Sequence, residues 1–347
     1  MNNIVNQAFE DSNLPQVICI GEALLDRLGP LGGDPLIDKP VEDRLGGAPA
    51  NVACCLAKLG IQSAFCGRLG ADFIGKDFQN LFKARGVNFQ GLQIDDQRPS
   101  RIVLVHRDET GERSFQGFVG DIGMGFADQA FSFSDLLQPL SGLIPQAIWL
   151  LVGTIPLAAR TSEEALLRSI DEAHTQGIQL ALDINWRSTF WDPTSSPESG
   201  PTKNDLKKIA PLLEKADLLK LANEEALWFF NSNDPWKISR SLSKRPDVVI
   251  TDGAKPVRWS IAGFGGEMEV FAPPSVVDTT GAGDAFTAGL LNQLLRLPAK
   301  PQNQKEAEHV VSFAAACGAL VCRGAGSIDP QPSYDEVISF LVEVAGR

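Results

Sequence analysis

Two carboxylates, Asp278 and Asp284, bracket a glycine-rich loop in the stretch VVDTTGAGDAF at residues 276–286. Prolines before this stretch favour an extended chain, and apolar residues at a spacing of four after it predict a helix. The loop would then lie at a helix N-terminus, where free N–H groups and the positive end of the helix dipole bind anions. Gly281 and Gly283 let the backbone approach an oxyanion without interference from a Cβ atom.

Asp284 has two interpretations. An Asp at a helix start commonly stabilises the first turn, and a lone Asp there would need no further role. The Gly-Ala-Gly run directly before Asp284 favours a different role, a carboxylate that faces a reacting hydroxyl beside the anion site. We expect the helix dipole to favour the ionised form of Asp284 and to make it a weak base.

Polar residues near the first predicted strand could bind a polyol. Asp26 follows the strand, and the carboxyl ends of strands are where open α/β sheets bind ligands. Gly46 and Gly47 precede a helix expected to begin near Ala50, and Asn51 offers both a donor and an acceptor. An ordinary loop Asp and a tight helix entry remain alternatives. The sequence GGAPAN does not match the dinucleotide fingerprint.

Two other predicted strands end in polar residues. The stretch DINWRSTFW brings three groups that could orient a substrate or a phosphate, and an Arg is well suited to phosphate. The stretch ITDGAKP brings a small hydroxyl residue and a glycine, which could form a wall on the nucleotide side. These residues are Asp183, Asn185, Arg187, Thr251 and Gly253.

The stretch GADFIGKD at residues 70–77 has most of the phosphate-binding P-loop pattern. Asp77, however, stands where that pattern needs a Ser or Thr to hold magnesium, and an acid there would oppose the phosphates. We interpret the stretch as a turn that enters a helix after a strand near residues 64–67.

Composition excludes several classes of protein. The 347 residues carry a net charge of −12, which disfavours binding to nucleic acid or to an anionic membrane surface. Six cysteines lie mostly in apolar runs without a C-x-x-C pair, which predicts buried free thiols in a reducing compartment. Three isolated histidines make a zinc site improbable. With no secretory signal or membrane-spanning run recognised, we expect a cytoplasmic protein.

Short apolar runs alternate with helical patterns along the chain. The runs at 16–21, 147–153, 178–185, 217–222 and 247–253 predict buried strands. The clearest helix is TSEEALLRSIDEAHTQG, with a capping box of Thr161 and Glu164 and with Gly177 ending it. Such alternation predicts right-handed crossovers and a parallel sheet covered on both faces.

Two regions interrupt this alternation. Residues 27–45 are rich in Gly, Pro and Asp, and residues 101–118 contain two β-prone arms around DETG, which predicts a hairpin. We expect both to contribute to a small β-rich lid. The chain then divides into an N-terminal tail at 1–13 and one domain at 14–347, with lid segments at about 27–45 and 98–120. The polar stretch at 191–205 is expected to be a surface loop.

Together these residues resemble the ribokinase-like (PfkB) sugar kinase family, from about residue 17 to residue 328. DTTGAGDAF is similar to the family's C-terminal signature, and GGAPANVA with GRLGADFIG is similar to its N-terminal signature. GEALLD, DINWRSTFW and GERSF are closest to the fructokinase branch. The resemblance implies a ribokinase-like α/β fold with three αβα layers, a mostly parallel central sheet and a small lid. It also implies transfer of the γ-phosphoryl group of ATP to a sugar primary hydroxyl, with D-fructose 6-phosphate as the first expected product.

The same resemblance implies a role for each candidate residue. Asp284 would be the general base, and the backbone N–H groups of Gly281, Ala282 and Gly283 would form the anion hole. The sugar would be held by Asp26, Gly46, Gly47, Asn51 and Arg187. ATP would arrive with Mg²⁺ and lie beside Lys220, Asn223, Thr251 and Gly253. A monovalent cation, expected to be K⁺, would lie at Asp278, Thr280 and, as a weaker candidate, Ser327.

The chain departs from the family pattern at three places. The family's Asn-x-x-Glu has Ala226 at its last position, with Glu225 one residue early. Pro256 replaces the last glycine of T-x-G-x-x-G, and QGFVGDIG replaces the Arg-Asn-Pro usual in fructokinases. Other sugars therefore stay open: 2-keto-3-deoxygluconate, ribose or a nucleoside. A catalytically silent scaffold is a further alternative, which the intact Asp284 disfavours. The lid could also serve as a homodimer interface.

Overall fold

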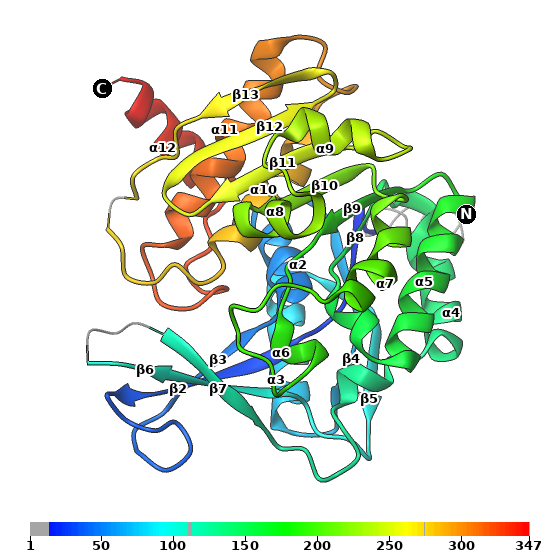
Figure 1. Ribbon diagram of the computed structural model, residues 1–347, viewed down its shortest axis with the longest axis vertical. Helices are drawn as coiled ribbons and strands as arrows, with labels where there is room; N and C mark the ends of the chain where they lie inside the picture. The colour runs from blue at the N-terminus through cyan, green and yellow to red at the C-terminus, as the bar shows by residue number, and fades with distance from the viewer. Residues whose placement is uncertain (1–13, 110–112, 274, 347) are drawn as a thin grey trace, which may run out of the picture.

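A nine-stranded sheet forms the centre of the computed structural model, which describes residues 14–109, 113–273 and 275–346 (Figure 1). Its strands lie in the order β13-β12-β11-β10-β9-β8-β1-β4-β5. The strands β11 to β5 in this order are parallel, and β12 and β13 are antiparallel. Their bounds are β1 Val17–Ile20, β4 Ser63–Gly70, β5 Asn88–Asp95, β8 Trp149–Val152, β9 Gln179–Asp183, β10 Leu218–Ala222, β11 Asp247–Asp252, β12 Lys255–Ile261 and β13 Phe264–Met268. All five predicted strands are confirmed, and so is the strand before GADFIGKD.

Helices cover both faces of this sheet, as the alternating pattern predicted. One face packs against α2 Ala48–Lys58, α3 Phe73–Arg85, α10 Ala282–Arg296, α11 Gln304–Val321 and α12 Tyr334–Ala345. The other packs against α4 Phe133–Leu143, α5 Arg160–Thr175, α7 Lys203–Leu213, α8 Asn223–Phe230 and α9 Pro235–Ser241. Short helical turns complete the chain at α6 Ser188–Trp191, η1 Ala127–Ala130, η2 Ile144–Gln146 and η3 Ile155–Ala158.

A separate four-stranded sheet projects from one end of the molecule, at the lower left of Figure 1. It consists of β2 Leu24–Leu31, β3 Glu42–Gly46, β6 Ile102–Arg107 and β7 Arg113–Val119, in the order β3-β2-β6-β7. These strands come from the two predicted lid segments, and β6 and β7 form the predicted antiparallel hairpin. The tip of that hairpin at 110–112 and the predicted tail at 1–13 lie outside the described residues.

One local prediction was wrong, and one residue lies in an element that the sequence did not indicate. Asp26 follows the first strand, as expected, and lies within β2, where it pairs with Arg44 of β3, because the chain turns directly into the lid sheet. The capping box of Thr161 and Glu164 is absent, because α5 begins at Arg160, straight after the turn η3. Gly177 does follow the end of α5, with a left-handed φ of 75°.

Chemistry-bearing loops gather at the carboxyl ends of the parallel strands, which meet at one edge of the sheet. The predicted surface loop occupies the irregular stretch between α6 and α7 and is tied down by a 2.8 Å hydrogen bond from Trp186 Nε1 to the Ser199 carbonyl. All six cysteines are buried and free, as predicted. Within the described ranges, no helix has the length and apolar character needed to cross a membrane.

Candidate active site

The glycine-rich loop turns into α10 at Gly281, the N-cap residue, as the sequence predicted. Gly281 has a left-handed φ of 80°, and a Cβ atom there would lie 2.6 Å from the Cβ atom of Ser327. Both observations require glycine. The Ala282 N–H donates to the Thr279 carbonyl at 3.2 Å, so the amides that follow it in the first helical turn are the freer donors for an anion.

Asp284 lies in this first turn and accepts a 2.7 Å hydrogen bond on Oδ2 from Nδ2 of Asn51. Desolvation raises the pKa of Asp284 to about 6, and the nearby Asp183 adds to the increase. The Asn51 hydrogen bond and the charges of Lys220 and Arg187 act in the opposite direction. This direction is opposite to our expectation of a weak base, because burial favours the neutral form of Asp284.

Lys220 lies directly beneath the loop. Its Nζ would be 3.2 Å from a Cβ atom at Gly283, and it donates to Asp183 Oδ1 at 3.2 Å. Asp183 Oδ2 accepts from the hydroxyl of Thr287 at 2.9 Å. Burial lowers the pKa of Lys220, but the negative charge of Asp183, together with other nearby carboxylates, outweighs burial and raises this pKa. The ammonium group is thus a fixed positive charge beside the predicted anion hole.

The stretch after β9 supplies two further polar residues. Arg187 is exposed and acts electrostatically on Asp284, and its Nη1 also donates to the Trp186 carbonyl at 2.8 Å. Asn185 has a left-handed φ of 41°, which is uncommon outside glycine. Glu225 is buried and accepts from the backbone N–H groups of Trp186 and Ala222, both at 2.7 Å. It therefore braces β9 against β10.

The predicted sugar-binding residues converge from the lid and α2. A Cβ atom at Gly46 would lie 2.8 Å from Asp26 Oδ2 and one at Gly47 would lie 2.6 Å from the Glu22 carbonyl, so both positions permit close approach of other groups. Asn51 is buried, with its side chain directed at Asp284. These residues share one end of the sheet with the Asp284 carboxylate.

A cavity of about 530 Å³ adjoins the other side of the loop. Ala282, Gly283 and Phe286 of α10 line it together with two of the four predicted nucleotide residues, Thr251 and Gly253. Its remaining walls are mainly apolar and small, among them Val257, Val270, Phe271, Ala315, Gly318 and Ala319. The cavity is large enough for a nucleotide and reaches the anion loop.

Asn223 does not contribute to the lining of this cavity. Its Oδ1 accepts from Nη2 of Arg258 on β12 at 2.5 Å and from Asn233 Nδ2 at 3.4 Å. Arg258 was not a candidate from the sequence. Because β12 is an antiparallel strand absent from the predicted alternation, no sequence signal placed its side chain beside α8.

The residues predicted to hold a monovalent cation support the glycine-rich loop through hydrogen bonds. Asp278 is buried, and its Oδ1 accepts from the N–H and the hydroxyl of Thr280 at 2.9 and 2.7 Å. Its Oδ2 accepts from the Gly326 N–H at 2.7 Å. The Ser327 hydroxyl donates to Asn51 Oδ1 at 3.0 Å. Among the described residues, no cluster of three His, Cys, Asp or Glu side chains could hold a metal ion.

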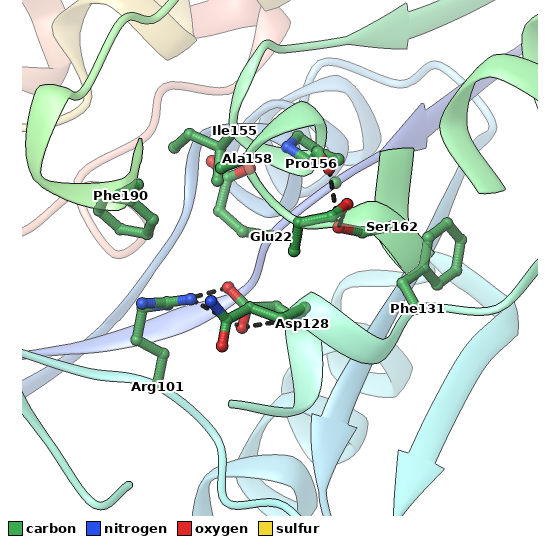
Figure 2. Close-up of a pocket in the computed structure, with 12 residues that line it drawn as sticks. Glu22, Arg101, Asp128, Phe131, Ile155, Pro156, Ala158, Ser162 and Phe190 are labelled. Carbon is green, nitrogen blue, oxygen red and sulfur yellow. Dashed lines mark hydrogen bonds and ion pairs between the residues drawn. The ribbon is translucent and has the colours of Figure 1, made fainter. Parts of the chain in front are cut away.

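Sequence reasoning missed a second, small cavity of about 20 Å³ at the base of the lid (Figure 2). Figure 2 shows Arg101 directed at Asp128, its bidentate partner at 2.9 and 3.1 Å, with Glu22 and Phe190 nearby. Glu22 is buried and its Oε2 has no hydrogen-bond partner among the residues that the structure describes; burial raises its pKa to about 8. Glu22 follows the end of a predicted strand, so the sequence could have indicated its carboxyl group as a candidate site residue. The Arg101–Asp128 pair has no sequence signature.

The comparisons with known proteins agree with this geometry. A family model described as "pfkB family carbohydrate kinase" matches residues 14–333. The chain is 32% identical over 328 residues to the fructokinase of Vibrio alginolyticus, covering 94% of this chain and 99% of the relative. It is 32% identical over 334 residues to "Probable fructokinase-6, chloroplastic" of Arabidopsis thaliana, covering 95% of this chain and 83% of the relative.

Solved structures show the same similarity. A fructokinase from Xylella fastidiosa with bound ATP superposes with a TM-score of 0.78 and 26% identity, over 96% of this chain and all of that chain. A double mutant of the Vibrio cholerae fructokinase, with fructose, ADP and potassium ion bound, superposes with a TM-score of 0.77 and 29% identity, over 95% of this chain and 99% of that one.

Proposed function

Because the chain belongs to the pfkB family of carbohydrate kinases, we propose that its site transfers the γ-phosphoryl group of ATP to the primary hydroxyl of D-fructose, giving D-fructose 6-phosphate. The observation that carries this proposal is the position of the α10 N-terminus. On one side of it lie the Asp284 carboxylate and the predicted sugar-binding residues of the lid. On the other side lies the 530 Å³ cavity. A phosphoryl group passing from the cavity to the sugar side would cross the free amides of the first helical turn.

Each residue then has a physical task. Asp284 aligns the sugar hydroxyl and takes its proton as the bond to phosphorus forms, and its raised pKa suits it to that task near neutral pH. Charge spreads over the phosphoryl oxygens in the transition state, so the helix N-terminus and Lys220 stabilise it. The lid residue Asp26, with Gly46 and Gly47, orients the remaining sugar hydroxyls.

Two ions complete the proposal. Mg²⁺, when bound with ATP, neutralises phosphate charge. Since the described residues offer no cluster of three acidic or His side chains, the ion would be held mainly by the phosphates. A monovalent cation, K⁺ in our proposal, fits behind the loop, where buried Asp278 supplies a negative charge and already organises Thr280 and Gly326. The potassium ion bound in the Vibrio cholerae fructokinase structure supports this choice.

A panel of acceptors tests the substrate. D-fructose, ribose, 2-keto-3-deoxygluconate and a nucleoside would each be given with MgATP, with and without K⁺, and ADP release would be coupled to a spectrophotometric readout. We expect the highest kcat/KM on D-fructose and activation by K⁺. Strong turnover of another acceptor with none on fructose would overturn the substrate assignment. No turnover on any acceptor would favour the silent scaffold.

Two properties of the whole molecule are also proposed. Large apolar side chains on and beside β2 are exposed, with Leu31 at 62%, Leu36 at 55% and Ile37 at 77%, and a homodimer through the lid would cover them. A doubled mass in sedimentation that is lost in Ile37→Asp supports this assembly.

Six buried free thiols suit a reducing compartment, so we propose a cytoplasmic location, which fractionation of cells would test.

A further inference from the structure

Asn51 uses both polar atoms of its side chain inside the protein. Its Nδ2 donates to Asp284 Oδ2 at 2.7 Å, and its Oδ1 accepts from the Ser327 hydroxyl at 3.0 Å. Asn51 is 4% exposed and Ser327 is 2% exposed. Three residues from α2, the loop after α11 and α10 therefore form one buried chain of hydrogen bonds that ends on the carboxylate.

The chemistry of the donors gives this chain a direction. An ionised carboxylate only accepts hydrogen bonds, so the amide nitrogen of Asn51 must face Asp284, and its amide oxygen then accepts from the Ser327 hydroxyl. An amide turned by half a rotation would place an oxygen against the carboxylate oxygen, which is repulsive. The Ser327 hydroxyl stabilises this orientation by satisfying the amide oxygen, so Asn51 stays in place to hold Asp284 Oδ2 while Oδ1 remains for a reacting hydroxyl.

Gln331 holds the other two members of the chain together. Its Nε2 donates to the Asn51 carbonyl at 2.9 Å and to the Ser327 carbonyl at 3.0 Å, and the residue is 1% exposed. This clamp keeps α2 and the Ser327 loop at a constant separation. The neighbouring Gly326 N–H binds Asp278, so the same loop also touches the proposed cation site.

We propose that Asn51, oriented by Ser327 and clamped by Gln331, is a positioning residue that fixes which oxygen of the Asp284 carboxylate faces the sugar hydroxyl. This inference rests on the proposed function, in which Asp284 is the base. It assigns to Ser327 an indirect role in proton transfer, because its hydroxyl orients Asn51, which in turn positions the carboxylate. This role replaces a direct contact of Ser327 with sugar or cation.

The ionisation of Asp284 reports on this arrangement. The Asn51 hydrogen bond lowers its pKa, so loss of an ordered donor moves the pKa upward. Three charged groups act on the pKa of the same carboxylate and stay in place when Ser327 is changed: Asp183 on β9, Arg187 after it and Lys220 on β10. The Asp284 charge in turn raises the pKa of Glu22 after β1 and of the Cys55 thiol on α2.

The test is the pH dependence of kcat in Ser327→Ala. We expect kcat to fall about threefold to tenfold, the value of one hydrogen bond, and the acid limb of the profile to move to higher pH. The KM for fructose and the K⁺ concentration for half-activation should stay within about twofold of the wild type, the scatter expected for a site without lost contacts. Ser327→Cys keeps a weak donor and should lie between the two. Ser169→Ala removes an equally buried hydroxyl on α5 and serves as the matched control.

Each other outcome overturns the proposal. A raised fructose KM with an unmoved acid limb would make Asn51 a sugar ligand only. A shifted K⁺ requirement with an unmoved limb would make Ser327 a cation ligand. An unchanged Ser327→Ala enzyme would show that Asn51 needs no orienting group. If the wild type turns over no acceptor, the proposed function fails instead. The crystal structure of Ser327→Ala then decides the inference by whether the contact between Asn51 and Asp284 persists.

Discussion

Asn51 on α2 and Asp284 on α10 lie 233 residues apart in the chain, and their side chains meet through a 2.7 Å hydrogen bond. The contact joins the two most distinctive motifs of the sequence, GGAPANVA and DTTGAGDAF. Among the described residues, the other carboxylate oxygen, Oδ1, accepts no hydrogen bond, and the residue lies in the first turn of α10.

Asp284→Asn is expected to lower kcat by about 10²–10⁴-fold, because an amide cannot accept the hydroxyl proton in the transition state. The fold should persist, since an amide of the same shape can still accept from Asn51. Steady-state kinetics with MgATP and fructose would measure the loss, and thermal unfolding would check the fold. A variant with near wild-type kcat would remove Asp284 from the mechanism.

The pH profile of kcat should show an acid limb near pH 6. Asp284 must be ionised to accept a proton, and burial raises its pKa to about 6, so activity should rise as the pH increases through that value. Because the folded-state pKa lies above the ordinary Asp value of 3.8, protonation favours the fold. Stability contributed by this group is therefore present below pH 3.8 and is lost as the pH rises to about 6. A limb below pH 4.5 would contradict the assignment.

Gly281→Ala should lower kcat roughly 10²-fold, the typical effect of disturbing an oxyanion site. A Cβ atom there would lie 2.6 Å from Ser327 and would force the loop away from the α10 N-terminus. Gly177→Ala is the matched control, because Gly177 has a similar φ of 75° and no atom of the described residues outside its chain neighbours lies within 4 Å of its Cβ position. The control should lose about 1 kcal/mol of stability from backbone strain and keep its kcat. Equal losses of activity in both variants would refute a special role for the loop.

Lys220→Met should destabilise the protein by about 3–5 kcal/mol, because it leaves Asp183 buried without its cation. The double variant Lys220→Met with Asp183→Asn should recover most of that loss, since no charge is then left unpaired. Chemical denaturation would measure both. If Lys220 also stabilises the transferring phosphoryl group, kcat should stay low in the double variant. Recovery of activity together with stability would limit Lys220 to a structural role.

The sequence alone was sufficient for features that depend on neighbours along the chain. The five predicted strands of the central sheet, the helix after the glycine loop and the lid hairpin each follow from local periodicity, Gly and Pro positions or turn residues. The motif residues between 278 and 286 are separated by only a few backbone bonds, so their proximity in space could be predicted from the sequence. Asp26 lies just beyond the first strand, as predicted, but the sequence did not show that it belongs to the lid strand β2, because lid and sheet strands follow one another with almost no loop.

Tertiary structure decided the partners of those residues. Ser327 reaches Asn51 across 276 residues, and Thr287 reaches Asp183 across 104. Such contacts depend on strand order and helix packing, which no local pattern specifies. The same is true of the pKa of Asp284. Its position at a helix start predicts a stronger acid, whereas the interior that forms around it only on folding removes water and makes it a better base.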